Sequence, residues 1–222
     1  METNPLISVL LPVYKHEAYL MDAVQSIINQ TYQNWELLIL NDNIEVDLTC
    51  YEFIDKRIKV FQDNEHKHKW SRINQGMFLA EGDFIAFQDA DDISIPQRLE
   101  LSYKFIGDFD FLYGDSIGMF QNGTNQYNKC QKLDIQNRPL GNQGSYFFYN
   151  QRLFPNFPEI DRGDDWIFVA KFVKANLKLN YLPLPLYYYR DYTGNFRKNS
   201  NRLKRYLSNR RLKKLVAEIT KS

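Results

Sequence analysis

This chain has few cysteines, no long apolar run and no excess of charge of one sign. Its 222 residues hold two cysteines, Cys50 and Cys130, and neither has a neighbour at metal-ligand spacing, which favours reduced thiols. No run approaches the roughly 18 apolar residues of a membrane span. The N-terminal residues also lack the basic region and small-residue cleavage site of a secretory signal. We therefore expect a cytoplasmic protein.

The charges are balanced, because 28 Lys and Arg residues stand against 27 Asp and Glu residues, for a net charge of +1. No overall field therefore points to nucleic acid as a partner. The 44% hydrophobic and 25% charged fractions are those of an ordinary globular protein, and disorder is not expected. The length favours one domain with an appendage.

Apolar runs and amphipathic segments alternate through the first 92 residues. Buried strands are expected at 6–14, 35–42, 58–64 and 83–92, and helices at 16–32 and 70–82. This alternation predicts an α/β fold with a mixed, mainly parallel central sheet flanked by helices, as in Rossmann-like domains. Ligands of such sheets bind beyond the carboxyl ends of the strands.

The pattern weakens after residue 94. A helix is expected at 95–106 and a strand at 109–116, followed by a polar loop or lid over 120–145. Strand character returns at 145–154, a helix and a strand follow within 163–182, and the proline-containing run 183–192 is typical of an edge strand. We place the main domain at 1–196 and a basic, amphipathic helix or linker at 197–222.

Polar residues end three of the predicted strands, and Asp42, Asp89 and Asp91 are among them. Asp89, Asp91 and Asp92 form a crowded acidic group whose pKa values would rise unless a cation were present. Oxygen ligands select hard ions such as Mg²⁺ or Mn²⁺. The alternative is that some of these residues, Asp92 above all, only cap the helix that starts near Pro96.

Three motifs in order resemble those of the family 2 glycosyltransferases, which have the GT-A fold and invert the configuration of the sugar. They are "PVYKHEAYLMDAVQSIINQTYQNWELLILND", "INQGMFLAEGDFIAFQDADDISIPQRL" and "GDDW". The resemblance extends from about residue 6 to 192, close to the whole chain. It implies a transferase that moves a sugar from a nucleotide-diphosphate sugar to a hydroxyl of a glycan or lipid-linked acceptor, as in polysaccharide biosynthesis.

The resemblance also implies site residues. Binding of the nucleotide-sugar is carried over to Pro12, Tyr14, Glu17, Asp42, Arg72, Asp89 and Ala90. In this assignment Asp42 accepts a hydrogen bond from the base, usually uracil. Asp91 is a direct ligand of Mn²⁺ or Mg²⁺, with Asp89 near the ribose and the metal. Asp165 is the catalytic base that deprotonates the acceptor.

Some positions depart from the family pattern. Asn43 stands where glycine is usual, and Tyr192 stands where the family often has a histidine that reaches the metal. The basic residue expected to contact the diphosphate is not uniquely placed. Lys67, Lys69 and Arg72 are candidates, and we choose Arg72.

Two further features have competing interpretations. His66 and His68 have the look of a zinc site, but two histidines in a polar loop without a Cys or Glu partner are more often solvated. The segment from Arg197 holds ten basic residues against one acidic residue, Glu218. It either packs on the domain or links to further chain, or makes peripheral contact with an anionic membrane. Nucleic-acid binding is the least favoured interpretation because no motif accompanies the charge.

Two other functions stay open. A nucleotidyltransferase would pair an acidic metal site with the same kind of sheet, but it would need a glycine-rich loop after the first strand, and "PVYKHEAYL" has no glycine. A catalytically inactive, glycan-binding relative would be of a different class. The presence of Asp42, Asp89, Asp91 and Asp165 together argues against such decay.

Overall fold

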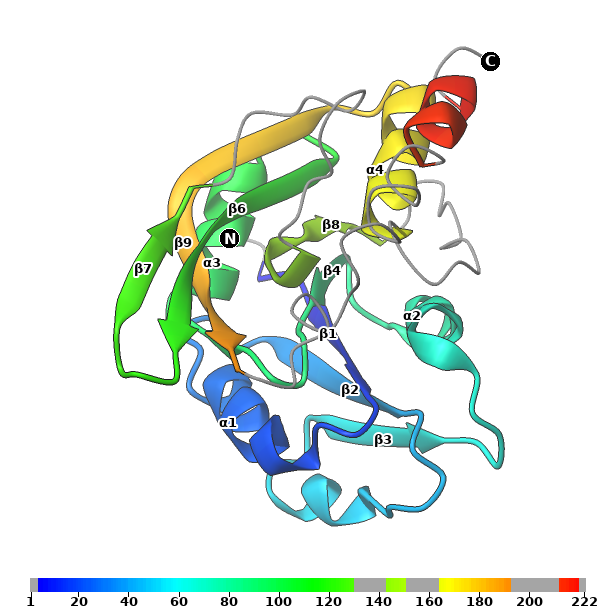
Figure 1. Cartoon of the computed structure of the whole chain (residues 1–222), viewed down its shortest axis with the longest axis vertical. Helices are drawn as coiled ribbons and strands as arrows, with labels where there is room; N and C mark the ends of the chain where they lie inside the picture. Colours follow the sequence, from blue (N-terminus) through cyan, green and yellow to red (C-terminus); the bar gives the residue numbers. More distant parts are fainter. Residues whose placement is uncertain (1–3, 130–142, 151–163, 193–211, 220–222) are drawn as a thin grey trace.

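The computed structural model of the chain describes residues 4–129, 143–150, 164–192 and 212–219 (Figure 1). The strands are β1 (Ile7–Val13), β2 (Trp35–Asn41), β3 (Ile58–Gln62), β4 (Phe84–Phe87), β5 (Ile93–Ser94), β6 (Phe111–Phe120), β7 (Asn125–Asn128), β8 (Phe147–Tyr149) and β9 (Leu179–Asp191). The helices are α1 (Glu17–Ile28), α2 (His68–Leu79), α3 (Arg98–Ile106) and α4 (Asp164–Lys174), with short 3₁₀ turns η1 (Thr49–Phe53) and η2 (Gln143–Ser145).

One curled, mixed sheet joins these strands in the order β3-β2-β1-β4-β8-β6-β9-β5, with β7 paired to β6. Strands β1 to β4 are mutually parallel, and β6 pairs with β9 in a second, long parallel ladder. The pairs of β4 with β8, β8 with β6, β6 with β7 and β5 with β9 are antiparallel and shorter. The predicted α/β class is confirmed.

Helices cover both faces of the sheet, so its central strands are apolar along most of their length. On one face α1 and α3 pack with alternate residues of β1 and β2, such as Val9, Leu11 and Leu37. On the other face α2 and α4 pack with the intervening residues, such as Leu10 and Leu38. This double coverage explains why "LISVLLPV" and "WELLIL" lack the polar alternation of a half-exposed strand.

The second half of the sheet matches the sequence less closely. The polar stretch expected as a loop contributes β7, which forms a hairpin with β6. Strand β9 begins before the two prolines and lies beside the end of the sheet, because only the two residues of β5 pair on its outer side, with Tyr187 and Tyr188. Pro183 and Pro185 therefore face no β5 residue, which is what a missing N–H requires.

The C-terminal segment is helical over residues 212–219 and lies beside α4 (Figure 1). Leu212 and Val216 are buried in a small cluster with Trp166, Ile167 and Ala170 of α4. This packing supports the interpretation in which the segment covers the domain, while residues 197–211 lie outside the described part. Within the described ranges, no helix has both the length and the apolar character needed to cross a membrane.

Candidate active site

Four segments meet at the carboxyl ends of β1, β2 and β4. Residues 14–17 follow β1, residues 42–46 follow β2, and residues 88–92 follow β4. The fourth, residues 66–69, leads into α2 and contacts two of the others, because Lys67 bonds to Asp42 and Lys69 pairs with Asp89. The predicted strand-end site is thus one contiguous group of polar side chains.

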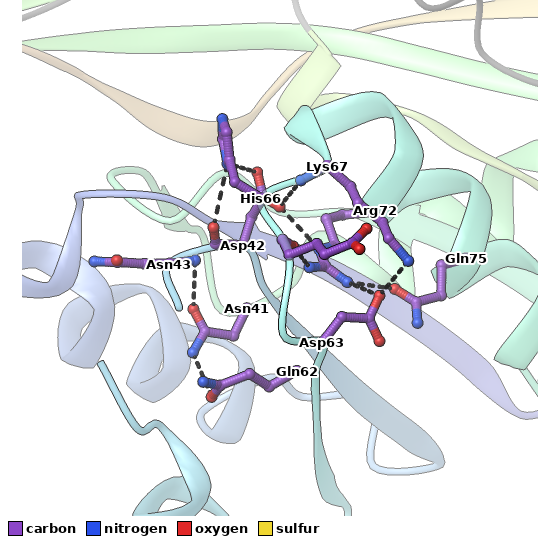
Figure 2. Close-up of polar contacts among 10 residues, drawn as sticks. Asn41, Asp42, Asn43, Gln62, Asp63, His66, Lys67, Arg72 and Gln75 are labelled. Carbon is purple, nitrogen blue, oxygen red and sulfur yellow. Dashed lines mark hydrogen bonds and ion pairs between the residues drawn. The ribbon is translucent and has the colours of Figure 1, made fainter. Parts of the chain in front are cut away.

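Asp42 is buried at the end of β2 and is held by α2 (Figure 2). Its Oδ1 atom accepts hydrogen bonds from the backbone N–H of Lys67 at 2.7 Å and from Arg72 Nε at 3.0 Å. The Arg72 side chain is fully buried. Its remaining nitrogens donate to Asp63 at 2.5 Å, to Gln75 at 3.0 Å and to a backbone carbonyl at 2.8 Å.

This geometry changes the expected role of Arg72. All three guanidinium nitrogens bond inside the protein, so in this conformation the side chain fixes Asp42 and does not extend toward a diphosphate. A buried arginine with these partners is a rigid support for the carboxylate. Arg72 and Gly76 are one helical turn apart, and Gly76 lies against Leu40 and Leu10, so this face of α2 packs on the sheet.

The second oxygen of Asp42 has a different environment. Oδ2 is buried and accepts no hydrogen bond from the described residues, although His66 Nδ1 lies 2.8 Å away. The same Nδ1 atom is 3.3 Å from the backbone carbonyl oxygen of Asp42. The imidazole also stacks on the Tyr14 ring, with centroids 4.4 Å apart and planes inclined by 25°. Tyr14 and Asp42, both predicted site residues, are therefore brought together through His66.

The loop after β2 is cross-linked to α1 by Asn43. Its Nδ2 donates to Glu17 Oε1 at 2.6 Å, and its backbone N–H donates to Asn41 Oδ1 at 3.0 Å. Asn43 does not adopt a left-handed backbone, so the side chain and not the backbone freedom of glycine explains this residue. Glu17 thus supports the loop that carries Asp42. Pro12 lies in β1 opposite Leu40 of β2.

The acidic loop after β4 holds its carboxylates in three environments. Asp89 Oδ1 pairs with Lys69 Nζ at 2.5 Å. Asp91 Oδ2 accepts a hydrogen bond from the Tyr192 hydroxyl at 3.1 Å and lies 3.9 Å from His16 Nε2. Burial raises the pKa of Asp91, and the negative charge of Asp89 raises it further. Ala90, between them, is buried.

Asp92 is an internal residue of this loop. Its Oδ1 accepts the backbone N–H of Arg190 at 2.9 Å, and its buried Oδ2 has no hydrogen-bond partner among the described residues. Burial and the charges of Asp89 and Asp91 raise its pKa well above the ordinary carboxyl value. Asp92 therefore ties the acidic loop to β9, and no capping bond from its side chain to α3 is present in the described residues.

A buried arginine lies behind the acidic loop. The Arg98 guanidinium donates to Gln88 Oε1 at 3.0 Å, to Ser94 Oγ at 2.8 Å and to the carbonyl of Phe87. Burial lowers its pKa to about 10, while the charges of Asp89 and Asp92 oppose that shift. This cation and its network hold the backbone on both sides of the acidic residues.

The acidic loop has the donors that a hard divalent ion requires. Two carboxylates, Asp89 and Asp91, are separated by one residue, and burial together with the charge of Asp89 raises the pKa of Asp91, a penalty that a cation would reduce. In the described residues no three His, Cys, Asp or Glu side chains are grouped as a metal site. The hydroxyl of Tyr192 occupies the position next to Asp91 where the family pattern often has histidine. His66 and His68 form no zinc cluster there either.

Asp165 lies in the first turn of α4, but its side chain is outside the described part. Its neighbour Trp166 is buried against the C-terminal helix, so it is a core residue of that contact. His16, which also lies near Asp91, is not among the residues that the sequence motifs predict for the site. No pattern marks it, because proximity to Asp91 arises only when β1 and β4 pair.

The fold and site together define an α/β domain with an acidic site at the carboxyl ends of its parallel strands. The sequence of residues 8–174 matches the family described as Glycosyl transferase family 2. The chain therefore belongs to the family 2 glycosyltransferases.

Similar proteins agree with this assignment. The putative glycosyltransferase EpsE of Bacillus subtilis is 33% identical over 111 residues, which cover 48% of this chain and 40% of that protein. The UDP-Glc:alpha-D-GlcNAc-diphosphoundecaprenol beta-1,3-glucosyltransferase WfgD of Escherichia coli is 36% identical over 115 residues, covering 50% and 45% of the two chains. The chain thus spans less than half the length of these relatives.

Solved structures confirm the GT-A fold. S. aureus TarS 1–349 in complex with UDP-GlcNAc superposes with a TM-score of 0.70 at 21% identity, over 88% of this chain and 61% of TarS 1–349. The mannosyltransferase PcManGT of Pyrobaculum calidifontis, in complex with GDP-Man and Mn²⁺, gives 0.64 at 15% identity, over 88% and 59% of the two chains.

Proposed function

We propose that this protein binds a UDP-sugar together with Mn²⁺ or Mg²⁺ and transfers the sugar, with inversion, to a hydroxyl of a glycan or lipid-linked acceptor. The observation that carries the proposal is the pairing, in one strand-end site, of a half-satisfied buried carboxylate with an acidic loop. Asp42 has one oxygen left to receive a base, and Asp89 and Asp91 have the crowded charge that a metal-diphosphate neutralises.

The state of Asp42 favours uracil or thymine over guanine. Oδ1 already accepts two hydrogen bonds, so only Oδ2 is left for a ligand. Uracil and thymine offer one N–H, at N3, to a single oxygen. Guanine offers a parallel N1–H and N2–H pair that requires both oxygens, and cytosine offers an acceptor at N3. Relatives add support, since WfgD is named for its use of UDP-Glc and TarS was solved with UDP-GlcNAc.

In this proposal, different residues carry out different parts of the transfer reaction. Asp165 takes the proton from the acceptor hydroxyl, whose oxygen bonds to the anomeric carbon as the bond from that carbon to the diphosphate oxygen breaks. Attack opposite the leaving group inverts the configuration. Asp91 and Asp89 would hold the divalent ion, which when bound neutralises charge on the leaving diphosphate. Lys69, and not the buried Arg72, is the cation of α2 that lies beside the acidic loop, so we assign it to the diphosphate.

A thermal-shift panel of UDP, dTDP, CDP and GDP, each with Mn²⁺, tests this proposal. A ligand at one hundred times its dissociation constant stabilises the folded state by about 2.7 kcal/mol. We expect UDP and dTDP to raise the melting temperature, and CDP and GDP to have little effect. In Asp42→Asn, which cannot act as an anionic acceptor, the advantage of UDP should shrink.

Preferential stabilisation by GDP would contradict the base assignment. If none of the four nucleotides stabilised the protein, the donor proposal would be wrong, and direct binding of glycans would become the better account. Binding of UDP-sugars without turnover on any acceptor would instead point to an inactive relative.

A further inference from the structure

We propose that His66 is an intramolecular competitor for the nucleobase: its imidazole occupies the place of the base against Asp42 and Tyr14, and it must leave before a nucleotide binds. This inference rests on the proposed function, because it takes Asp42 as the residue that receives the base. It adds a residue that sets the affinity and selectivity of the base subsite.

Asp42 has only one carboxylate oxygen that a base could use. Its Oδ1 atom is saturated by Lys67 N–H and Arg72 Nε, at 2.7 and 3.0 Å. Its Oδ2 atom is buried, and His66 Nδ1 lies 2.8 Å from it (Figure 2). Because Oδ2 has almost no exposed surface while the imidazole lies against it, a base can reach this oxygen only after His66 has moved.

The His66 imidazole imitates the features that a nucleobase would offer to Asp42 and Tyr14. Its planar ring stacks on Tyr14, with ring centroids 4.4 Å apart, and its in-plane Nδ1 atom lies 2.8 Å from the Asp42 carboxylate. A pyrimidine with an N3–H has the same two features, a planar face and an in-plane donor. To replace His66 in the same way, a ligand must supply both at its N3 edge, whereas cytosine has an acceptor at N3 and carries its donor on the exocyclic N4.

The contact between His66 Nδ1 and the Asp42 carboxylate has poor hydrogen-bond geometry. Oδ2 accepts no hydrogen bond of good geometry, and the Nδ1 atom is shared with the backbone carbonyl of Asp42 at 3.3 Å. A buried carboxylate oxygen without a donor destabilises the folded state. An aligned N–H from a base would satisfy this oxygen better than the imidazole does.

The His66 side chain can move without unfolding of its segment. Its side chain is 35% exposed, whereas the Asp42 side chain is 2% exposed. The backbone of the segment is anchored one residue later by the bond from Lys67 N–H to Asp42. A change of side-chain rotamer would therefore clear the subsite, and the only other ring against the imidazole among the described residues besides Tyr14 is His68, at 4.6 Å.

The test is the dissociation constant of UDP with Mn²⁺, measured by calorimetry for the wild type, His66→Ala and His66→Phe. The apparent affinity is reduced by the fraction of molecules in the competent state, so removing the competitor should tighten UDP about ten-fold in His66→Ala. His66→Phe keeps a ring to stack on Tyr14 but has no donor, and its affinity should fall between the two. The matched control is His68→Ala, which removes the neighbouring histidine but leaves His66 against Asp42, and it should change the affinity for UDP much less than His66→Ala does.

Inorganic pyrophosphate with Mn²⁺ serves as the second control, because it has no base. Its affinity should be the same in the wild type and His66→Ala. Unchanged or weaker UDP binding in His66→Ala, with UDP bound by the wild type, would overturn this inference and leave the proposed function intact. Absence of UDP binding by the wild type and every variant would overturn both. Equal tightening of pyrophosphate and UDP would show a general opening of the site and would also refute the competitor role.

Discussion

Replacing Arg72 with methionine should destabilise the protein strongly, because it leaves Asp42 as a buried, uncompensated charge. The Arg72 side chain is 0% exposed and the Asp42 side chain 2% exposed, and Nε is 3.0 Å from Oδ1. Removing one partner of such a buried pair costs about 3–5 kcal/mol. The adjoining pair with Asp63 is 30% exposed on the acidic side, so Asp63→Asn should cost less than about 1 kcal/mol.

Urea unfolding of the wild type, Arg72→Met, Asp42→Asn and the double variant measures this coupling. The double variant has no uncompensated charge, so it should be more stable than the sum of the single losses predicts, by about 1–3 kcal/mol. The slope of unfolding free energy against urea should stay constant, which shows that the unfolded states are comparable.

The same variants separate two roles for Arg72. If it supports Asp42, as the contacts indicate, Arg72→Met lowers stability and weakens UDP, while pyrophosphate with Mn²⁺ binds as in the wild type. Wild-type stability combined with a large loss of pyrophosphate affinity would refute the structural role. It would restore Arg72 as a diphosphate contact.

Three further predictions follow from single residues. Burial raises the pKa of Asp92, so its charge destabilises the metal-free fold above the ordinary carboxyl pKa and not below it. Asp92→Asn should therefore raise the free energy of unfolding in urea by about 1–3 kcal/mol at about pH 8 and leave it unchanged near pH 3. An equal increase at both pH values would contradict this cause. Asp165→Asn should lower transfer about 10³-fold with donor affinity unchanged; turnover within ten-fold of the wild type would remove Asp165 as the base. Gly82→Ala should lose about 1–3 kcal/mol by thermal unfolding, because its Cβ would lie 2.7 Å from backbone atoms of Leu6 and Ser8; wild-type stability would show that this strand accommodates the methyl group.

Much of the fold could be predicted because strands that are buried on both faces appear in the sequence as short, nearly continuous apolar runs. β1 and β2 are apolar at most of the positions that the sheet buries, with Ser8, Glu36 and Asn41 as exceptions, and the helix α1 shows one apolar face. The second half was less predictable, because β8 has three residues and β5 two, too short for a period to emerge. Their positions depend on pairing with β4 and β9, which are distant in sequence.

The site shows the same division. Asp42, Asp89 and Asp91 could be placed together because each ends a strand or follows one, and parallel strands bring their carboxyl ends to one edge. The partners of those residues could not be predicted from the sequence. His66 lies in a polar stretch with no periodicity, and only the fold brings it against Asp42 and Tyr14. The burial of Arg72 depends likewise on how α2 packs on the sheet.

The most direct test of the central claim is the dissociation constant of UDP-GlcNAc with and without Mn²⁺, for the wild type and Asp91→Asn. If the acidic loop holds a metal that binds the diphosphate, Mn²⁺ should tighten the nucleotide-sugar by at least about ten-fold in the wild type, a gain of about 1.4 kcal/mol, and by much less in Asp91→Asn. Tight binding that is indifferent to Mn²⁺ and to Asp91, or no binding at all, would contradict a metal-dependent nucleotide-sugar site at this edge of the sheet.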